Sequence, residues 1–188
     1  MLTTESVNYG LWVTWLTSWI AAMFWSGRTE KKDSVGAELI FRALFYLGLI
    51  LLFALPQRNQ FWHLVSLESW ILNAIVAVGL AFTWWARLHL GRLWSDRVER
   101  KEGHHVIETG PYRIVRHPIY SGLLLAAFAT AIEKATPSAM LGCGVLTVAF
   151  IIKAKREEQF LRAELGGCAY DAYARKTAML VPFPRPYR

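Results

Sequence analysis

Long uncharged apolar runs constrain the fold of this 188-residue chain more than any other feature. Residues 6–27 carry no charged side chain over 22 positions, and residues 69–86 carry none over 18. A helix of about 20 apolar residues spans the hydrocarbon core of a bilayer, whereas soluble helices of this length normally show a polar face. The two runs therefore predict membrane-spanning helices rather than a soluble bundle.

Three further runs complete a predicted all-α, multi-pass integral membrane protein with about five transmembrane helices. Residues 39–55 contain one charge, Arg42, near their start, where the side chain can reach the membrane interface. Residues 119–132 and 135–152 are separated by two charged residues, and the first of these runs, with 14 residues, is short for a full crossing. We expect this pair to form a tight helical hairpin, followed by amphipathic helices in a cytoplasmic tail.

The basic residues are distributed unequally between the loops of this arrangement. If all five runs cross, 18 of the 21 Lys and Arg residues fall in the first loop, the third loop and the tail, which share one side. Basic loops favour the cytoplasmic side of a membrane. The pattern predicts an N-terminus outside the cytoplasm and a cytoplasmic third loop and C-terminus. The net charge of +7 is then a consequence of topology, and no nucleic-acid partner is expected.

Two sets of residues that suggest metal or nucleotide chemistry have simpler interpretations. His104 and His105 are adjacent, so they do not face one way on a helix or a strand, and no metal site is expected. Gly142 and Gly144 form a GxG in an apolar run with no strand before it, which indicates close helix packing rather than a nucleotide-binding loop.

The segment TGPYRIVRHPIYSG, residues 109–122, places basic and aromatic side chains directly before an apolar run. Pro118 fits the first turn of a helix because its missing N–H would be unpaired there, and His117 before it is biased towards an extended backbone. Arg116 and His117 then lie at a hydrophobic boundary, where a charge is costly unless it is paired. The segment indicates either an interfacial anchor or a site for an anionic or zwitterionic ligand.

A second polar cluster lies in the tail, where Glu157 and Glu158 stand in tandem near the same boundary. We expect residues 157–165 to form an amphipathic helix along the membrane surface, ended by two glycines. A second short helix is expected to carry Tyr170 and Tyr173. A solvated helix face explains most of these charges but explains the two carboxylates poorly.

Together and in this order, these segments form the pattern GPY…RHPxYxG…EE…GxxxYxxY. This pattern resembles that of the isoprenylcysteine carboxyl methyltransferase family, within a wider group that includes phospholipid methyltransferases. The resemblance covers roughly residues 87–184. It implies an integral-membrane enzyme that uses S-adenosylmethionine without a Rossmann domain, in a cytoplasm-facing pocket formed by the last helices and the tail. It also divides the chain into N-terminal transmembrane helices, residues 1–86, and a catalytic region, residues 87–188.

The resemblance implies two sets of site residues. The implied cofactor contacts are Arg97, His104, His105, Val106, Ile107, Tyr112, His117, Pro118, Ile119, Tyr120 and Glu158. The candidate catalytic residues are Arg116, His117, Lys155, Arg156 and Glu157. The carboxylate of the cofactor suits an arginine or histidine, and its ammonium suits Glu158.

The sequence departs from the family at one position. The family carries an arginine about one helical turn before the second glutamate, where it is thought to orient the carboxylate of the substrate. Here that position is Ala154, flanked by Lys153, Lys155 and Arg156, and helical spacing does not decide which of these faces the site. Arginine forms a bidentate fork with a carboxylate and lysine does not, so the departure bears on the acceptor.

The expected function is S-adenosylmethionine-dependent methyl transfer to a lipophilic acceptor at the bilayer, with the carboxylate of a prenylcysteine-like molecule as the first candidate. A carboxylate with a pKa of about 4 is ionised at neutral pH and needs no base. A phospholipid amine or a phenolic or pyrone lipid hydroxyl would need a proton acceptor, for which His104, His117 and Glu157 are candidates. A sterol-type membrane reductase that uses NADPH is a further alternative.

Overall fold

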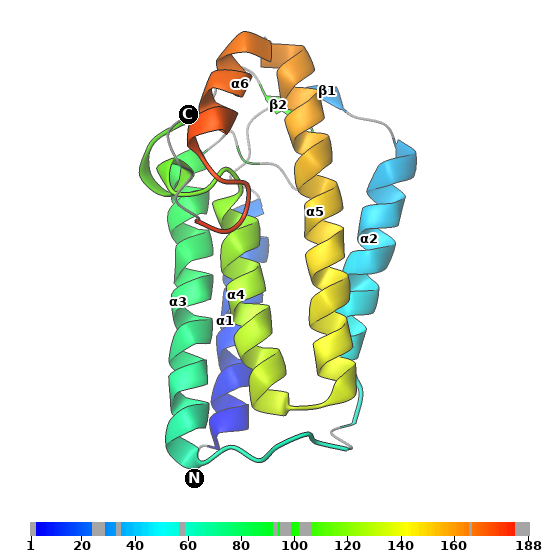
Figure 1. Ribbon diagram of the computed structural model, residues 1–188, viewed down its shortest axis with the longest axis vertical. Helices are drawn as coiled ribbons and strands as arrows, with labels where there is room; N and C mark the ends of the chain where they lie inside the picture. The colour runs from blue at the N-terminus through cyan, green and yellow to red at the C-terminus, as the bar shows by residue number, and fades with distance from the viewer. Residues whose placement is uncertain are drawn as a thin grey trace.

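The computed structural model describes residues 3–23, 29–32, 35–56, 59–91, 94, 99–101, 107–165 and 167–182. Five long helices run alternately in opposite directions (Figure 1), namely α1 (Thr4–Met23), α2 (Val35–Leu49), α3 (Ser66–Leu90), α4 (Pro118–Lys134) and α5 (Pro137–Leu165). A π-helical segment, Ile50–Ala54, extends α2, and a short helix, α6 (Gly167–Lys176), follows α5. The N-terminus lies at one end of the bundle and α6 at the other.

Two short strands add a feature that the predicted all-α fold lacks. β1 (Thr29–Lys32) and β2 (Glu99–Lys101) pair antiparallel, with Lys32 opposite Glu99. Their sequences, TEKK and ERK, contain no alternation of apolar and polar residues, which is the pattern by which a strand is recognised in a sequence. The pairing joins the α1–α2 and α3–α4 connections at the α6 end of the bundle (Figure 1).

The last long helix corrects one expectation about the tail. Residues 157–165 were expected to form a separate amphipathic helix, but they are the final turns of α5, which is 29 residues long. This prediction is wrong because no glycine or proline interrupts the chain between residues 145 and 165, so the helix continues past the end of the apolar run. The expected short helix with Tyr170 and Tyr173 is present as α6.

Helices α4 and α5 form the predicted hairpin. Only Ala135 and Thr136 connect them, and Ala135 takes the left-handed conformation at φ 52° that ends a helix. The Ala135 N–H donates to the Ala131 carbonyl at 3.0 Å. The tight turn holds the two helices side by side, so that the segment before α4 and the end of α5 meet at the α6 end.

Glycines allow close approach at two helix crossings. A Cβ at Gly79 of α3 would lie 2.7 Å from the Gly122 carbonyl of α4, and a Cβ at Gly142 of α5 would lie 2.7 Å from the Gly48 carbonyl of α2. These approaches are shorter than any real Cβ contact, so a larger residue would push the helices apart. Close packing is therefore confirmed for Gly142, whereas Gly144 faces open space.

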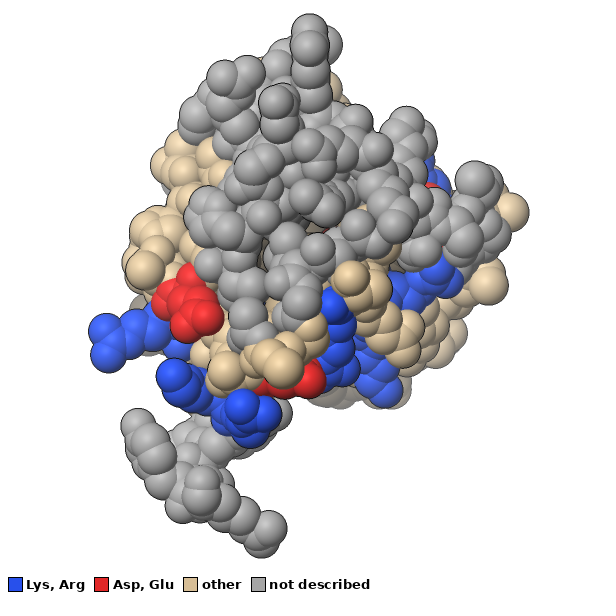
Figure 2. Space-filling view, turned by 90° about the horizontal axis from the view of Figure 1, so that it is seen from above, with Lys and Arg blue, Asp and Glu red and all other residues tan. Residues whose placement is uncertain are grey.

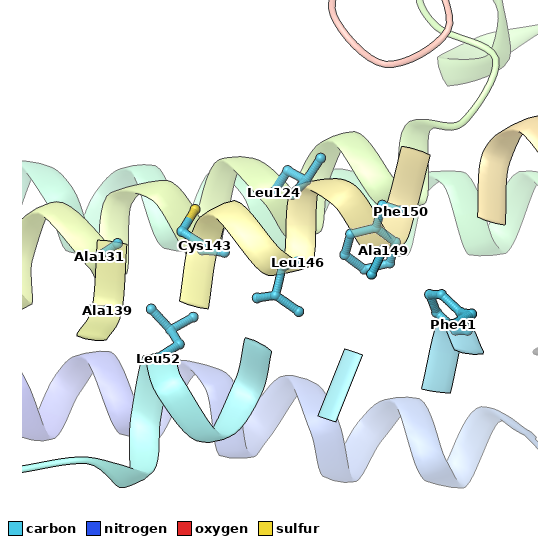
Figure 3. Close-up of a cluster of buried hydrophobic side chains, with 10 residues drawn as sticks. Phe41, Leu52, Leu124, Ala131, Ala139, Cys143, Leu146, Ala149 and Phe150 are labelled. Carbon is cyan, nitrogen blue, oxygen red and sulfur yellow. The ribbon is translucent and has the colours of Figure 1, made fainter. Parts of the chain in front are cut away.

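The main core lies between α2, α4 and α5 (Figure 3). It contains Phe41 and Leu52 from the α2 region, Leu124 from α4, and Leu146 and Phe150 from α5. Large apolar side chains also face outward, and those more than half exposed on the five long helices include Val13, Leu39, Val78, Leu141 and Val148. Two helices, Ser66–Leu90 and Pro137–Ala163, are long and apolar enough to cross a membrane.

Basic side chains gather at the α6 end. Seen from this end, Lys and Arg lie along the rim of the described surface (Figure 2). The exposed ones are Arg113, Lys155, Arg162, Arg175 and Lys176. The distribution agrees with the expectation that the basic loops share one side of the bundle.

Candidate active site

The local fold before α4 places two basic side chains at the edge of the core. Gly110 has a φ of 57°, which a glycine adopts without strain, and begins a 3₁₀ helix, η3 (Gly110–Arg113). A Cβ there would also strike the His89 ring at 2.5 Å. Pro118 occupies the first turn of α4, as predicted, and His117 before it has φ −123° and ψ 65°. Because His117 is not helical, Arg116 and His117 are free to face α5 rather than continue the helix surface.

The end of α5 supplies two carboxylates to these cations. The Arg116 Nε donates to the Glu158 Oε1 at 2.7 Å, and the His117 Nε2 lies 3.2 Å from the same oxygen. The His117 Nδ1 lies 3.3 Å from the Glu157 Oε2. The Tyr120 hydroxyl donates to the Glu157 Oε1 at 2.7 Å. We call these five residues the ionic cluster.

The ionic cluster is removed from solvent and balanced in charge. The Arg116 and His117 side chains are each 7% exposed, and the Glu158 side chain is 10% exposed. Burial by itself lowers the pKa of His117, but hydrogen bonds and charge from Glu157 and Glu158 raise it, and the net direction is upward from the usual 6.5. A protonated imidazole donates from both nitrogens, which matches its position between two carboxylates.

Aromatic rings continue from the cluster into the bundle. The His117 ring stacks on Tyr120 with centroids 5.4 Å apart and an interplanar angle of 7°. Tyr120 in turn stacks on Phe150 of α5 at 5.0 Å and 23°. Phe150 lies near Phe41 of α2, and the Lys153 ammonium stands 4.4 Å from the centre of the Phe41 ring. The rings form a wall that begins at the ionic cluster and ends at a second cation.

The chain after α6 returns to the start of α4 (Figure 1). We call residues 177–180 the C-terminal strap. The backbone N–H groups of Arg116 and His117 donate to the carbonyls of Ala178 and Met179 at 2.8 and 3.1 Å. The Ser121 hydroxyl donates to the Leu180 carbonyl at 2.6 Å. The strap therefore covers one side of the ionic cluster.

The structure brings together only some of the residues expected in the site. Arg116, His117, Tyr120, Glu157 and Glu158 meet in the ionic cluster. Pro118 and Tyr112 are buried beside it, and the Tyr112 carbonyl accepts a hydrogen bond from the Tyr173 hydroxyl at 2.6 Å. Ile107 and Ile119 are half-buried. Four expected cofactor contacts lie outside the described residues, namely Arg97, His104, His105 and Val106.

The three cations around Ala154 occupy different environments on α5. Lys153 is buried, with 7% exposure, and faces Phe41 of α2. Arg156 is half-buried, and Lys155 lies on the exposed face of the helix. Ala154 itself is fully buried, at 0% exposure. Lys153 is thus the most deeply buried of the three, four residues before Glu157 on the same face of the helix.

Sequence reasoning missed two components of the site. The strap contacts the cluster through backbone carbonyls, which any residue supplies, so no side-chain pattern marks them. Ser121 stands inside the RHPxYxG motif and was not expected to bind the tail. The small hydroxyl residue one turn after the proline was the one available signal, because serine in a first helical turn often bonds a nearby backbone group.

Comparison with known proteins gives consistent matches. The profile of the isoprenylcysteine carboxyl methyltransferase (ICMT) family matches residues 71–163. A probable protein-S-isoprenylcysteine O-methyltransferase of Oryza sativa subsp. indica is 28% identical over 145 residues, which cover 76% of this chain and 73% of the relative. Protein-S-isoprenylcysteine O-methyltransferase B of Arabidopsis thaliana is 26% identical over 150 residues, 77% of this chain and 72% of the relative.

A relative with another stated acceptor also matches. Methanethiol S-methyltransferase of Pseudomonas sp. (strain GM41(2012)) is 29% identical over 140 residues, 74% of this chain but 44% of the relative. The profile match runs from α3 almost to the end of α5 and contains the whole ionic cluster. Over residues 71–163 the chain matches the isoprenylcysteine carboxyl methyltransferase family, and it is a methyltransferase. The resemblance seen in the sequence is confirmed.

Proposed function

We propose that the chain transfers a methyl group from S-adenosylmethionine to a lipophilic acceptor at a bilayer surface, and that the acceptor is the carboxylate of a prenylcysteine-like molecule. One observation carries the proposal. The ionic cluster sits at one end of an apolar bundle, and its Glu158 has one oxygen committed to protein donors while Oε2 makes no hydrogen bond within the described part of the chain. That oxygen suits a cationic group of a ligand.

The residues present fit S-adenosylmethionine. Glu158 Oε2 would accept a hydrogen bond from the ammonium of the methionine end, because only Oε1 is bound by Arg116 and His117. The expected contacts from Arg97 and residues 104–107 would come from the connection between α3 and α4. When bound, the cofactor supplies an electrophilic methyl group.

The protein residues would act mainly by binding and orientation. Arg116 and His117 hold Glu158 in place, and Tyr120 holds Glu157. A carboxylate acceptor is already ionised near pH 7, so no residue needs to remove a proton. Alignment of two reactants with exclusion of water can lower a barrier by ~7–11 kcal/mol.

We assign Lys153 rather than Lys155 or Arg156 to the anionic group of the acceptor. Lys153 is buried beside the Phe41 ring, and it lies one turn before Glu157, which supports this choice. Ionisable residues inside apolar helices mark functional sites more often than packing. The half-buried Tyr120, which stacks on the core residue Phe150, would then lie beside the lipophilic part of the acceptor.

The methanethiol S-methyltransferase relative supports a second class of acceptor. An ordinary thiol has a pKa of about 8.5, below the value of about 10 for a phenol, so a nearby lysine ammonium would favour loss of its proton and formation of the reactive thiolate. Methylation of a thiol is therefore the second candidate. Phospholipid amines and phenolic lipids would need a proton acceptor, and His117 and Glu157 already bind each other.

We further propose that all five long helices cross the bilayer, with the N-terminus outside and the α6 end in the cytoplasm. The outward apolar residues on α1 and α2 and the basic rim at the α6 end support this topology. The first three helices, up to residue 86, would then serve as a scaffold. Residues 87–188 would supply the catalytic region.

Calorimetric titration of the detergent-purified protein tests the proposal. We expect micromolar-range binding of S-adenosylmethionine and its demethylated product, and no binding of NADPH. Transfer of a labelled methyl group is then compared among a prenylcysteine, a small thiol, a phospholipid amine and a phenolic lipid. Binding of NADPH alone would favour a reductase and contradict the proposal, and preference for the thiol would favour the second candidate.

A further inference from the structure

The Arg116 side chain joins three separate parts of the chain. Its Nε donates to the Glu158 Oε1 on α5 at 2.7 Å. Its Nη1 donates to the carbonyls of Ala174, at 3.1 Å, and Thr177. The planar guanidinium presents its donors in a fixed fork, so one side chain can bind a carboxylate on one edge and carbonyls on another.

Two of these partners belong to the end of a helix. Helix α6 ends at Lys176, so Ala174 is in its last turn and Thr177 directly follows it. The last four carbonyls of a helix have no partner within the helix and carry partial negative charge. The Arg116 guanidinium thus caps the C-terminus of α6 and fixes the direction in which the chain leaves the helix.

The same residue also binds the strap through its backbone. The Arg116 N–H donates to the Ala178 carbonyl, and Val115 and Ala178 form a parallel β-bridge. His117 and Ser121 extend the contact to Met179 and Leu180. Side chain and backbone together hold α6 and the strap against the segment that carries His117.

We propose that Arg116 is a positioning residue that completes the site by fastening the C-terminal strap, and that it does not itself bind the ligand. Its Nε and Nη1 are directed to Glu158 and to two carbonyls of the tail, and its side chain is 7% exposed. Glu158 then presents Oε2 to the ligand. The effect on ligand binding rests on the proposed function, but the fastening of the strap does not.

This assignment differs from the role first expected for Arg116, which was contact with reacting groups. Loss of a catalytic contact would lower kcat, whereas loss of a positioning residue leaves the chemistry intact and raises KM for the cofactor. Lysine in place of arginine would bind Glu158 or the carbonyls but not both, because its single ammonium lacks the fork. Arg116→Lys should therefore recover only part of what Arg116→Ala loses.

Hydrogen exchange of the backbone amides gives a readout that is independent of ligand and activity. The full chain in detergent micelles is compared with Arg116→Ala, Arg116→Lys and the matched control Arg113→Ala, whose arginine lies in the same motif but is exposed. We expect the amides at positions 116 and 117 to exchange at least about tenfold faster in Arg116→Ala, and not in Arg113→Ala. The KM for S-adenosylmethionine should rise about tenfold or more, with kcat nearly unchanged.

A second variant tests the same proposal if Arg116→Ala fails to fold. Ser121→Ala removes the hydroxyl that binds the Leu180 carbonyl without touching Glu158, so it should loosen the strap and raise KM a few-fold. Unchanged exchange in both Arg116→Ala and Ser121→Ala would overturn the proposal. So would a loss of cofactor affinity in Arg116→Ala with normal strap protection, because it would make Arg116 a direct ligand.

Discussion

Each end of the bundle holds a carboxylate between helices, half-buried for Glu133 and buried for Glu158, but the two are bound in different ways. At the end opposite α6, Glu133 accepts from the amide of Asn8 at 2.5 Å and from the amide of Asn73 at 3.0 Å. At the α6 end, Glu158 is bound by Arg116 and His117 through one oxygen. Glu133 thus uses both oxygens to join α1, α3 and α4, whereas Glu158 uses only Oε1 among the described residues, and we propose Oε2 as the ligand contact.

The difference shows why empty volume alone does not locate a site in this protein. A cavity of about 230 Å³ lies beside Glu133 and is lined in part by Glu5, Tyr9 and Lys134. The Glu133 carboxylate already accepts hydrogen bonds from neutral amides, and Lys134 donates to the Tyr9 hydroxyl at 2.7 Å. Neutral donors to both oxygens suit a clamp between helices, whereas fixed cations and a remaining acceptor suit binding.

The largest expected effect comes from exchange of the two carboxylates for amides. Glu158→Gln should weaken S-adenosylmethionine binding about 30-fold or more, because truncation of one member of a buried charge pair costs ~2–5 kcal/mol. Calorimetry on the folded variant measures the change. Wild-type affinity in Glu158→Gln would remove Glu158 from the binding site.

Glu133→Gln is the matched control at the opposite end. It should lower the free energy of unfolding by ~1–3 kcal/mol, because a buried amide of Asn8 or Asn73 loses its acceptor. Cofactor affinity should stay within about twofold of the wild type, since distant sites act independently. Weakened binding with normal stability would contradict the division of roles between the two ends.

A smaller effect is expected when the charge of a single lysine on α5 is removed, and it should differ between Lys153 and Lys155. Lys153→Met keeps the length of the side chain but removes its charge, and it should raise KM for an anionic acceptor about tenfold. Lys155→Met, on the exposed face, is the control and should change little. Steady-state methyl transfer measures both, with cofactor affinity unaltered in each. Equal effects of the two substitutions would show that general surface charge, and not a buried ammonium, attracts the acceptor.

The smallest expected effect is a dependence of the free energy of unfolding on pH, which arises from His117 at the α6 end. His117 faces Arg116, Tyr120, Glu157 and Glu158, and its pKa is raised because the carboxylates outweigh burial. A raised pKa in the folded state stabilises the fold fully below about pH 6.5, and this stability is lost as pH rises through the folded value. The free energy of unfolding, measured by thermal unfolding, should therefore decline above pH 6.5 by at most ~1.4 kcal/mol per pH unit.

His117→Gln tests the origin of this decline. The variant should be less stable than the wild type at low pH, and its unfolding should depend less on pH above pH 6.5. A slope that persists unchanged in His117→Gln would assign the titration to another group.

Local patterns were sufficient for much of the fold and for part of the site. The apolar runs predicted the five long helices, and Pro118 predicted the start of α4, because helix length and a missing N–H are properties of a few consecutive residues. The RHPxYxG and EE motifs contain the five residues of the ionic cluster. The short strands and the continuation of α5 past residue 157 were not predicted, because polar residues form helix, strand or loop according to what packs on them.

The sequence by itself determined that this chain forms apolar helices with one charged segment before the fourth and another at the end of the fifth, and which family it resembles. Only the tertiary structure decided how these charges pair. Arg116 and Glu158 are 42 positions apart, and their contact depends on the hairpin of α4 and α5. The burial of Lys153 and the carbonyl contacts of the strap arise from helix rotation and from backbone groups common to all residues, which leave no mark in a sequence.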